Sequence, residues 1–132
     1  MPKKLVIEDN DKNRKLVKII LEANKYEVIE AVTAEESLKY LQDNKPDVIL
    51  LDIQLPNLGG IELVKMLKNR QDTKDIPIIA VTAYAMKGDK ERMLSAGCDA
   101  YMSKPIDTRQ LPLIVEDIIT KVKSHHRHRP NL

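Results

Sequence analysis

Val48-Ile49-Leu50-Leu51-Asp52 is a run of four consecutive apolar residues that ends in an acid. A second run of the same kind, Ile78-Ile79-Ala80-Val81, is followed by Thr82. Strands that are apolar at every position are buried on both faces, which is typical of a parallel sheet covered by helices on either side. The two runs therefore predict the centre of a parallel α/β sheet.

Shorter apolar runs alternate with amphipathic segments along the rest of the chain. Three further strands are expected at Leu5–Ile7, Tyr26–Ala31 and Ala100–Met102. Five helices are expected over residues 11–24, 33–44, 60–69 and 87–95 and from 111 onward, because apolar residues recur there at intervals of three and four. The residues expected to face the sheet from the first and third helices are Leu16, Ile19, Ile20, Ala23, Ile61, Val64, Met66 and Leu67.

Length and composition indicate one compact domain. The chain has 132 residues, of which 42% are apolar and 32% charged, so a buried core can form. We expect residues 1–123 to form the domain and residues 124–132 a basic, histidine-containing, disordered tail. No apolar run is long enough to span a membrane, and the single cysteine, Cys98, indicates a reducing, cytoplasmic setting.

The net charge of +2 has an uneven distribution along the chain. Lys and Arg number 22 and Asp and Glu 20, and four of the basic residues follow the last acid, Asp117. The remainder carries 18 basic against 20 acidic residues, a net of −2. We therefore expect no direct nucleic-acid binding by the domain itself.

Polar residues follow the apolar runs at the ends where parallel sheets bind ligands. They are Glu8, Asp9, Asp52, Thr82 and Lys104. If the strand order is 2-1-3-4-5, these side chains converge. Three carboxylates in one pocket repel one another, and a hard divalent cation, Mg²⁺ by preference, relieves that repulsion. With a hydroxyl and an ammonium group nearby, the pocket also suits a phosphoryl group, and a carboxylate there could be the nucleophile of phosphoryl transfer.

Five motifs in this order resemble the receiver domain of two-component response regulators, the CheY-like family. They are Glu8-Asp9-Asn10, Asp52-Ile53-Gln54-Leu55-Pro56 with Gly59-Gly60, Val81-Thr82-Ala83, and Lys104-Pro105. The resemblance spans about residues 4 to 120. Residues 82–89 and 97–101 resemble a narrower group, which is common in single-domain regulators of the DivK type and in receivers fused to hybrid kinases. The resemblance implies a flavodoxin-like (βα)5 fold, a three-layer sandwich around a five-stranded parallel sheet in the order 2-1-3-4-5.

The resemblance also implies roles for individual residues. Asp52 would accept the phosphoryl group from a histidine kinase or a histidine phosphotransfer protein. Glu8, Asp9, Asp52 and the Gln54 backbone carbonyl would hold Mg²⁺, while Thr82, the Ala83 amide and Lys104 would bind phosphoryl oxygens. Thr82 and Tyr101 would form a switch acting on an output protein through the surface of the fourth helix, fifth strand and fifth helix, and the Lys104–Pro105 bond would be cis.

Other interpretations remain open from the residues alone. Asp52 taken singly fits a turn, Thr82 the end of a strand, and Tyr101 simple aromatic packing. A magnesium-dependent phosphatase with an aspartate nucleophile shares the Asp, Thr and Lys but needs a second acid where this chain has Gln54. The chain could also act as an unphosphorylated scaffold, or be a receiver cut from a larger hybrid kinase or regulator. We expect a phospho-accepting signalling domain that is not an enzyme beyond its own phosphorylation and dephosphorylation.

Overall fold

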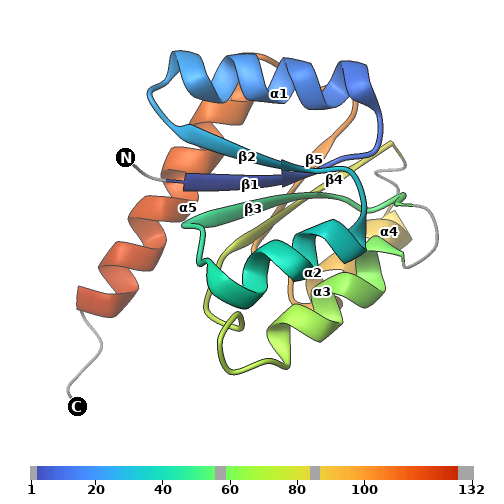
Figure 1. The fold of residues 1–132 in the computed structure, drawn as a ribbon, viewed down its shortest axis with the longest axis vertical. Helices are drawn as coiled ribbons and strands as arrows, with labels where there is room; N and C mark the ends of the chain where they lie inside the picture. Colours follow the sequence, from blue (N-terminus) through green and yellow to red (C-terminus); the bar gives the residue numbers. More distant parts are fainter. Residues whose placement is uncertain (1–2, 56–58, 84–86, 128–132) are drawn as a thin grey trace.

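A computed structural model describes residues 3–55, 59–83 and 87–127 and shows one sheet between two layers of helices (Figure 1). The strands are β1 (Lys3–Ile7), β2 (Glu27–Ala31), β3 (Val48–Asp52), β4 (Ile78–Thr82) and β5 (Ala100–Ser103). The helices are α1 (Asp11–Ala23), α2 (Ala34–Asp43), α3 (Gly60–Lys68), α4 (Lys87–Ala96) and α5 (Gln110–Arg127). The predicted alternation of strands and helices is confirmed.

All strand pairs are parallel, and the order across the sheet is β2-β1-β3-β4-β5. The chain adds β2 on one side of β1 and β3 on the other, so strand order reverses between β1 and β3. Ile7 pairs with Leu51 across this point. The predicted fold class and strand order are therefore confirmed, and the carboxyl ends of β1 and β3 lie next to each other.

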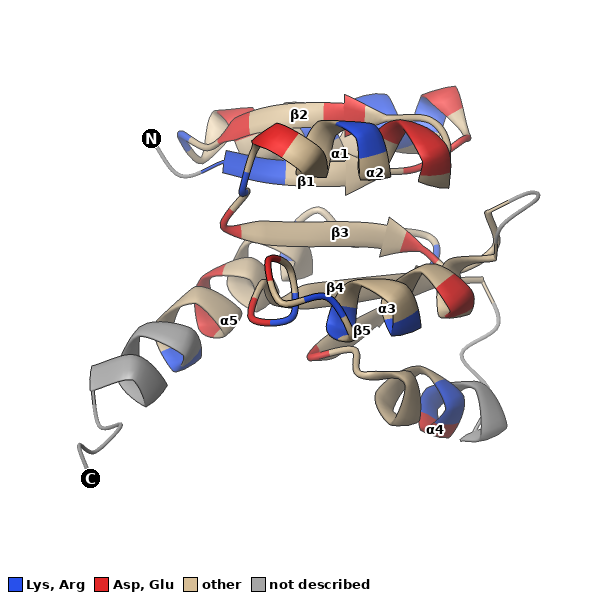
Figure 2. Cartoon of the chain, turned by 60° about the horizontal axis from the view of Figure 1, so that its bottom comes forward, with Lys and Arg blue, Asp and Glu red and all other residues tan. Residues whose placement is uncertain are grey.

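Each face of the sheet carries its own apolar core. Helices α1 and α5 cover one face, with Val17, Leu21, Leu111 and Val115 buried against it. Helices α2, α3 and α4 contribute to the other face, with Leu41, Leu63, Leu67 and Met93 among the buried residues. Figure 2 shows β3 and β4 free of charged residues over most of their length, while Lys, Arg, Asp and Glu lie mainly on helices and loops. This burial on both faces explains the uninterrupted apolar runs.

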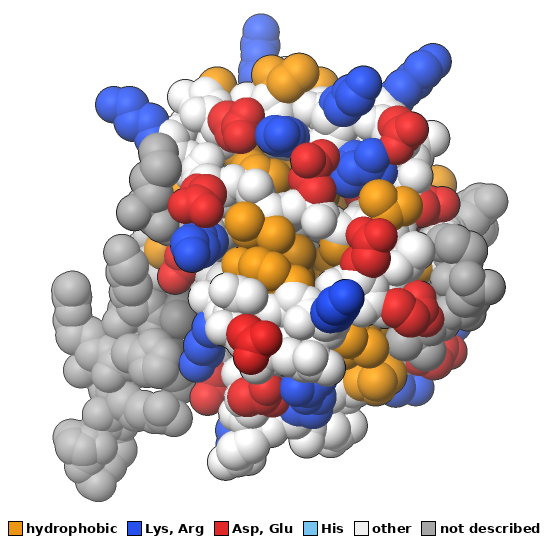
Figure 3. Space-filling view, viewed as in Figure 1, with side chains coloured by type: hydrophobic (Ala, Val, Ile, Leu, Met, Phe, Trp, Pro, Cys, Tyr) orange, Lys and Arg blue, Asp and Glu red, His pale blue; other side chains and the backbone are white. Residues whose placement is uncertain are grey.

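The surface carries charges of both signs. Figure 3 shows Lys and Arg interspersed with Asp and Glu over one face of the molecule, around apolar side chains near its middle. The described part of that face presents no extended basic surface. Among the helices of the described ranges, none combines the length and the hydropathy needed to cross a bilayer.

Two predicted helix faces are wrong in detail. Ile19 and Met66 were expected in the core, but their side chains are 65% and 40% exposed. Val17 and Leu21 are buried in α1 instead, and Leu63 is buried in α3. Apolar residues occur on more than one side of each helix, so the 3.6-residue period alone permits several stripes, and packing against the sheet selects one.

Regular secondary structure in the described chain extends further toward both termini than the sequence predicts. Strand β1 begins at Lys3, and Lys4 is completely buried with its Nζ 4.3 Å from the centroid of the Tyr26 ring. Helix α5 continues to Arg127, so residues 124–127 are helical instead of belonging to a disordered tail. No glycine or proline interrupts the helix after Pro112, which lies in its first turn where an amide hydrogen is dispensable. Residues 128–132 lie outside the described part of the chain.

Candidate functional site

The predicted polar residues meet at one edge of the sheet. Asp52 and Thr82 are the last residues of β3 and β4, and Glu8 and Lys104 directly follow β1 and β5. Asp52 pairs with Val81 in the sheet, and Thr82 with Ser103, so the four strand ends form a continuous rim. Side chains that are far apart in sequence are thereby held within contact distance.

Three carboxylates form the acidic part of this rim. Oxygens of Glu8, Asp9 and Asp52 lie within 4.8 Å of one another, with Glu8 only 4% and Asp52 only 3% exposed and Asp9 at the surface. Burial and the hydrogen bond with Asp52 raise the pKa of Glu8 to about 7, against a lowering hydrogen bond from the Asn10 amide. Crowded carboxylates of this kind suit a hard divalent cation with oxygen ligands, so the residues fit Mg²⁺.

Lys104 supplies the positive charge of the site. Its Nζ lies 3.1 Å from Asp52 Oδ2 and 3.4 Å from Glu8 Oε1. Burial lowers the pKa of Lys104, but the hydrogen bond and charge of Asp52 and the charge of Glu8 outweigh it and raise the pKa above its usual value. The ammonium group is therefore charged at neutral pH. The Lys104–Pro105 peptide bond is cis.

Gln54 connects the aspartate to the end of β4. Its backbone N–H donates to Asp52 Oδ1 at 2.9 Å. Its side-chain Nε2 donates to Thr82 Oγ1 at 2.8 Å, and its Oε1 accepts from the Ala83 N–H at 3.1 Å. The family resemblance implies a role for the backbone carbonyl of Gln54 and places Gln54 and Tyr84, two residues after Asp52 and Thr82, at positions that tune hydrolysis, but it does not predict these side-chain contacts. The side-chain contacts depend on the distance between β3 and β4, which spacing along the chain does not reveal.

Tyr101 occupies the middle of β5 and is half-buried against the apolar core on the α2–α3–α4 side of the sheet. Its ring centroid lies 5.3 Å from Nζ of Lys90 in α4. The residue thus links α4 to β5 at the surface expected to signal. Tyr84, two residues after Thr82, lies outside the described part of the chain.

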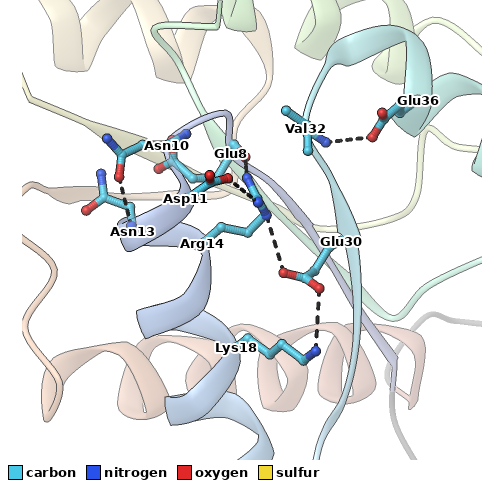
Figure 4. A network of polar contacts seen from close by, with 9 residues as sticks. All are labelled: Glu8, Asn10, Asp11, Asn13, Arg14, Lys18, Glu30, Val32 and Glu36. Carbon is cyan, nitrogen blue, oxygen red and sulfur yellow. Dashed lines mark hydrogen bonds and ion pairs between the residues drawn. The ribbon is translucent and has the colours of Figure 1, made fainter.

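A charged network holds the loop that carries Glu8 and Asp9 (Figure 4). Arg14 Nη1 in α1 donates to the Glu8 backbone carbonyl at 2.9 Å, while the same guanidinium pairs with Asp11 and, at 3.3 Å, with Glu30 in β2. Asn10 caps α1 by accepting from the Asn13 N–H at 2.9 Å. The sequence analysis missed Arg14. Its three-residue spacing from Asp11 on a helix was the available signal.

The geometry and the comparisons agree on the class of protein. The family of response regulator receiver domains matches residues 5–116. The chain belongs to this family, the CheY-like signalling domain of two-component systems, in which phosphorylation of an aspartate is expected. The resemblance inferred from the sequence motifs is confirmed.

Individual relatives narrow this assignment. The polar-differentiation response regulator DivK of Brucella anthropi is 46% identical over 119 residues, which cover 89% of this chain and 94% of that protein. A response regulator structure from Chloroflexus aurantiacus has a TM-score of 0.87 at 30% identity, covering 91% of this chain and 99% of that one. The receiver domain of a sensor histidine kinase from Pseudomonas aeruginosa, with magnesium coordinated in its active site cleft, has a TM-score of 0.83 at 29% identity, covering 90% and 98%. The chain is thus a receiver of the DivK type.

Proposed function

We propose that Asp52 is the phospho-acceptor of this receiver and that a histidine kinase or a histidine phosphotransfer protein is its donor. One observation carries the proposal: the buried Asp52 carboxylate has one oxygen bonded to the Gln54 N–H and the other paired with Lys104, with two further acids beside it. Residues 1–123 contain every group involved and form the receiver domain. The protein acts in the cytoplasm.

Glu8, Asp9 and Asp52, together with the Gln54 backbone carbonyl, would hold Mg²⁺. When bound, the ion neutralises charge on the carboxylates and on the incoming phosphoryl group. The crowding of the three acids supports this assignment, because a divalent cation relieves the repulsion between them, and so does the pKa of Glu8, which is raised by burial and by the neighbouring Asp52.

The transfer itself requires little from the protein beyond position and charge. An oxygen of Asp52 forms a bond to phosphorus as the phosphorus–nitrogen bond of the donor phosphohistidine breaks. The electron pair of that bond stays on the imidazole nitrogen, which takes up a proton. Lys104 pairs with a phosphoryl oxygen, and the Thr82 hydroxyl and the Ala83 N–H donate hydrogen bonds to the others.

The response to phosphorylation passes from Thr82 to Tyr101. Movement of Thr82 toward the phosphoryl group leaves room for Tyr101 to rotate inward, and the α4–β5–α5 surface changes shape. An output protein that binds this surface then discriminates between the two states by its different affinity for them. The half-buried position of Tyr101 beside α4 supports the assignment.

We assign no turnover of external phosphate esters to this site. A phosphatase with an aspartate nucleophile needs a carboxyl two residues further on as general acid and base, and the neutral amide of Gln54 cannot serve. Incubation with a small aryl phosphate and Mg²⁺ is expected to yield no multiple-turnover release of phosphate. Sustained turnover abolished by Asp52→Asn would favour the phosphatase instead.

The test of the acceptor is mass spectrometry after incubation with acetyl phosphate and Mg²⁺. Wild-type protein is expected to gain one phosphoryl group, and Asp52→Asn none. Asp47→Asn is a matched control, because Asp47 lies before β3 at the opposite end of the strand and binds the Lys3 backbone amide. Failure of the wild type to gain the group, or an adduct that persists in Asp52→Asn, contradicts the proposal.

A further inference from the structure

Asp9 is the most exposed of the three acids assigned to Mg²⁺, and its direction depends on the backbone. Lys104 and backbone amides hold the buried carboxylates of Glu8 and Asp52 in place. Among the described residues, none forms a hydrogen bond or an ion pair with the Asp9 carboxylate. The position of this carboxylate therefore follows from the path of the chain through the loop between β1 and α1.

That loop is fastened at the peptide unit that joins Glu8 to Asp9. Arg14 Nη1 donates to the Glu8 carbonyl oxygen at 2.9 Å, and this oxygen lies in the same peptide plane as the Asp9 N–H. One peptide earlier, the Glu8 N–H donates to the Ala31 carbonyl oxygen at 3.0 Å. Because a peptide unit is planar, a hydrogen bond to its oxygen also fixes the direction in which the chain enters Asp9.

The guanidinium group of Arg14 is itself held by two carboxylates. It pairs with Asp11 in α1 and lies 3.3 Å from Glu30 in β2, and the Arg14 side chain is only 13% exposed. Glu30 also accepts a hydrogen bond from Lys18 at 3.5 Å (Figure 4). These two acids and two bases form a neutral group, the α1–β2 charge cluster. Since its charges cancel, the cluster affects a nearby cation more through the geometry it imposes than through its field.

We propose that Arg14 is a positioning residue for Mg²⁺, acting through the Glu8 carbonyl to direct the Asp9 carboxylate toward the metal position. The inference rests on the proposed Mg²⁺ site of Glu8, Asp9 and Asp52. Loss of a residue that orients a metal ligand typically lowers metal affinity by roughly 10- to 100-fold. Arg14 contacts the backbone and not a ligand atom, so we expect about tenfold, the lower end of that range.

The sign of the effect distinguishes positioning from charge. The Arg14 side chain is a cation near a site for a cation, so removing its charge should by itself tighten Mg²⁺ binding. Losing the orientation of Asp9 should weaken the binding. A weaker affinity for Mg²⁺ in Arg14→Met therefore reports the loss of the contact with Glu8 and not the loss of charge.

The experiment titrates the metal-free protein with MgCl₂ alone at constant ionic strength and follows its amide resonances by NMR. Lys18→Met is the matched control, because it removes one positive charge from the same α1–β2 charge cluster while Arg14 keeps its hydrogen bond to Glu8. The Kd for Mg²⁺ is expected to rise about tenfold in Arg14→Met. In Lys18→Met it should stay within about twofold of wild type, since an exposed ion pair contributes little.

Two further measurements separate positioning from a general loss of structure. In metal-free protein, the amide nitrogen resonance of Asp9 should shift in Arg14→Met and not in Lys18→Met, because a hydrogen bond to the Glu8 carbonyl polarises that peptide unit. In an Asp9→Asn background the carboxylate to be oriented is absent, so Arg14→Met should weaken Mg²⁺ binding much less than it does in wild type. Arg14→Gln serves as the second variant if Arg14→Met folds poorly.

The outcomes separate the role of Arg14 from the metal site itself. If Mg²⁺ shifts no resonance of Asp9 or Asp52 in wild type, the proposed metal site fails and the role of Arg14 with it. If wild type binds Mg²⁺ but Arg14→Met binds it equally well or more tightly, only the role of Arg14 is overturned. Equal losses of affinity in Arg14→Met and Lys18→Met also overturn it, because the effect then belongs to the charge cluster as a whole.

Discussion

The charged half of the site (Glu8, Asp52 and Lys104) and its neutral half (Gln54, Thr82 and Ala83) lie on either side of the same carboxylate but are held by different forces. In the charged half, the Lys104 Nζ lies 3.1 Å from Asp52 and 3.4 Å from Glu8, and these carboxylates raise the pKa of Lys104, while burial and Asp52 raise the pKa of Glu8. In the neutral half, two hydrogen bonds of 2.8 and 3.1 Å join an amide to a hydroxyl and a backbone N–H. The groups of the charged half interact through their charges, whereas the groups of the neutral half interact through hydrogen bonds, which depend on direction.

Because of this difference, we expect the two halves of the site to perform different tasks. Charges in a poorly solvated place act on one another and on any incoming charge, so a change to one member alters the whole half. The hydrogen bond that the Gln54 amide oxygen accepts from the Ala83 N–H can be exchanged for one that a phosphoryl oxygen accepts. We therefore expect the charged half to determine whether Asp52 can react, and the neutral half to determine how the reaction alters the conformation.

The largest effect is expected from Lys104→Met. Phosphorylation by acetyl phosphate should slow by roughly 100-fold, because a charge that stabilises the phosphoryl oxygens in the transition state is lost. The rate is followed by mass spectrometry, with circular dichroism as the check on folding. Lys121→Met is the control, since the pair of Lys121 with Asp117 is exposed and distant from the site. A Lys104→Met rate within tenfold of wild type would mean that the charged half is not needed for reaction.

A second effect concerns Glu8 and pH in metal-free protein. The pKa of Glu8 is about 7 in the folded protein against 4.5 ordinarily, so the folded state binds the proton more tightly. The resulting stabilisation is fully present below about pH 4.5 and is lost as pH rises through about 7. Between about pH 5 and pH 8, the free energy of unfolding should fall more in wild type than in Glu8→Gln, by on the order of 2 kcal/mol.

Urea unfolding in a chelator at the two pH values measures this difference. Adding Mg²⁺ should restore wild-type stability at the higher pH, because the cation compensates the ionised acids. Equal pH slopes for wild type and Glu8→Gln would show that Glu8 titrates as an ordinary surface acid and that the charged half is not coupled as described.

The smallest effect on rate is expected from Thr82→Val, which keeps the shape of the side chain and removes its hydroxyl. Asp52 should still be phosphorylated, about threefold to fivefold more slowly, since one neutral hydrogen bond is lost. The change in hydrogen exchange of α4 and β5 on phosphorylation should disappear. If that change persists in Thr82→Val, the neutral half does not carry the conformational response.

Much of the fold follows from local patterns. The apolar runs that became β3 and β4 could only be buried on both faces, and the five strands alternate with helices as predicted. The order of the strands in the sheet was implied by the resemblance to the receiver family. The faces of α1 and α3 were partly mispredicted, because Ile19 and Met66 lie on stripes that are as regular as the buried ones. Only packing against the sheet distinguishes them.

The site was predicted as a set of residues but not as a set of contacts. Asp52, Thr82 and Lys104 could be selected because each follows an apolar run, and a parallel sheet brings such ends together. The side-chain contacts of Gln54 and the support of Glu8 by Arg14 were missed. Both depend on distances between elements that are not adjacent in the chain, β3 with β4 and α1 with β2.

The sequence by itself determined the alternation of strands and helices, the polar residues at the strand ends and the concentration of basic residues after Asp117. These are local properties, because burial on two faces and helical periodicity are both indicated by the types of residues that are close in the sequence. The tertiary structure alone decided which helix stripe is buried, that Lys4 lies inside, and that the Gln54 side-chain amide bonds to Thr82 and Ala83. Those outcomes depend on separations of a few ångströms between distant segments, which arise only when the whole core packs.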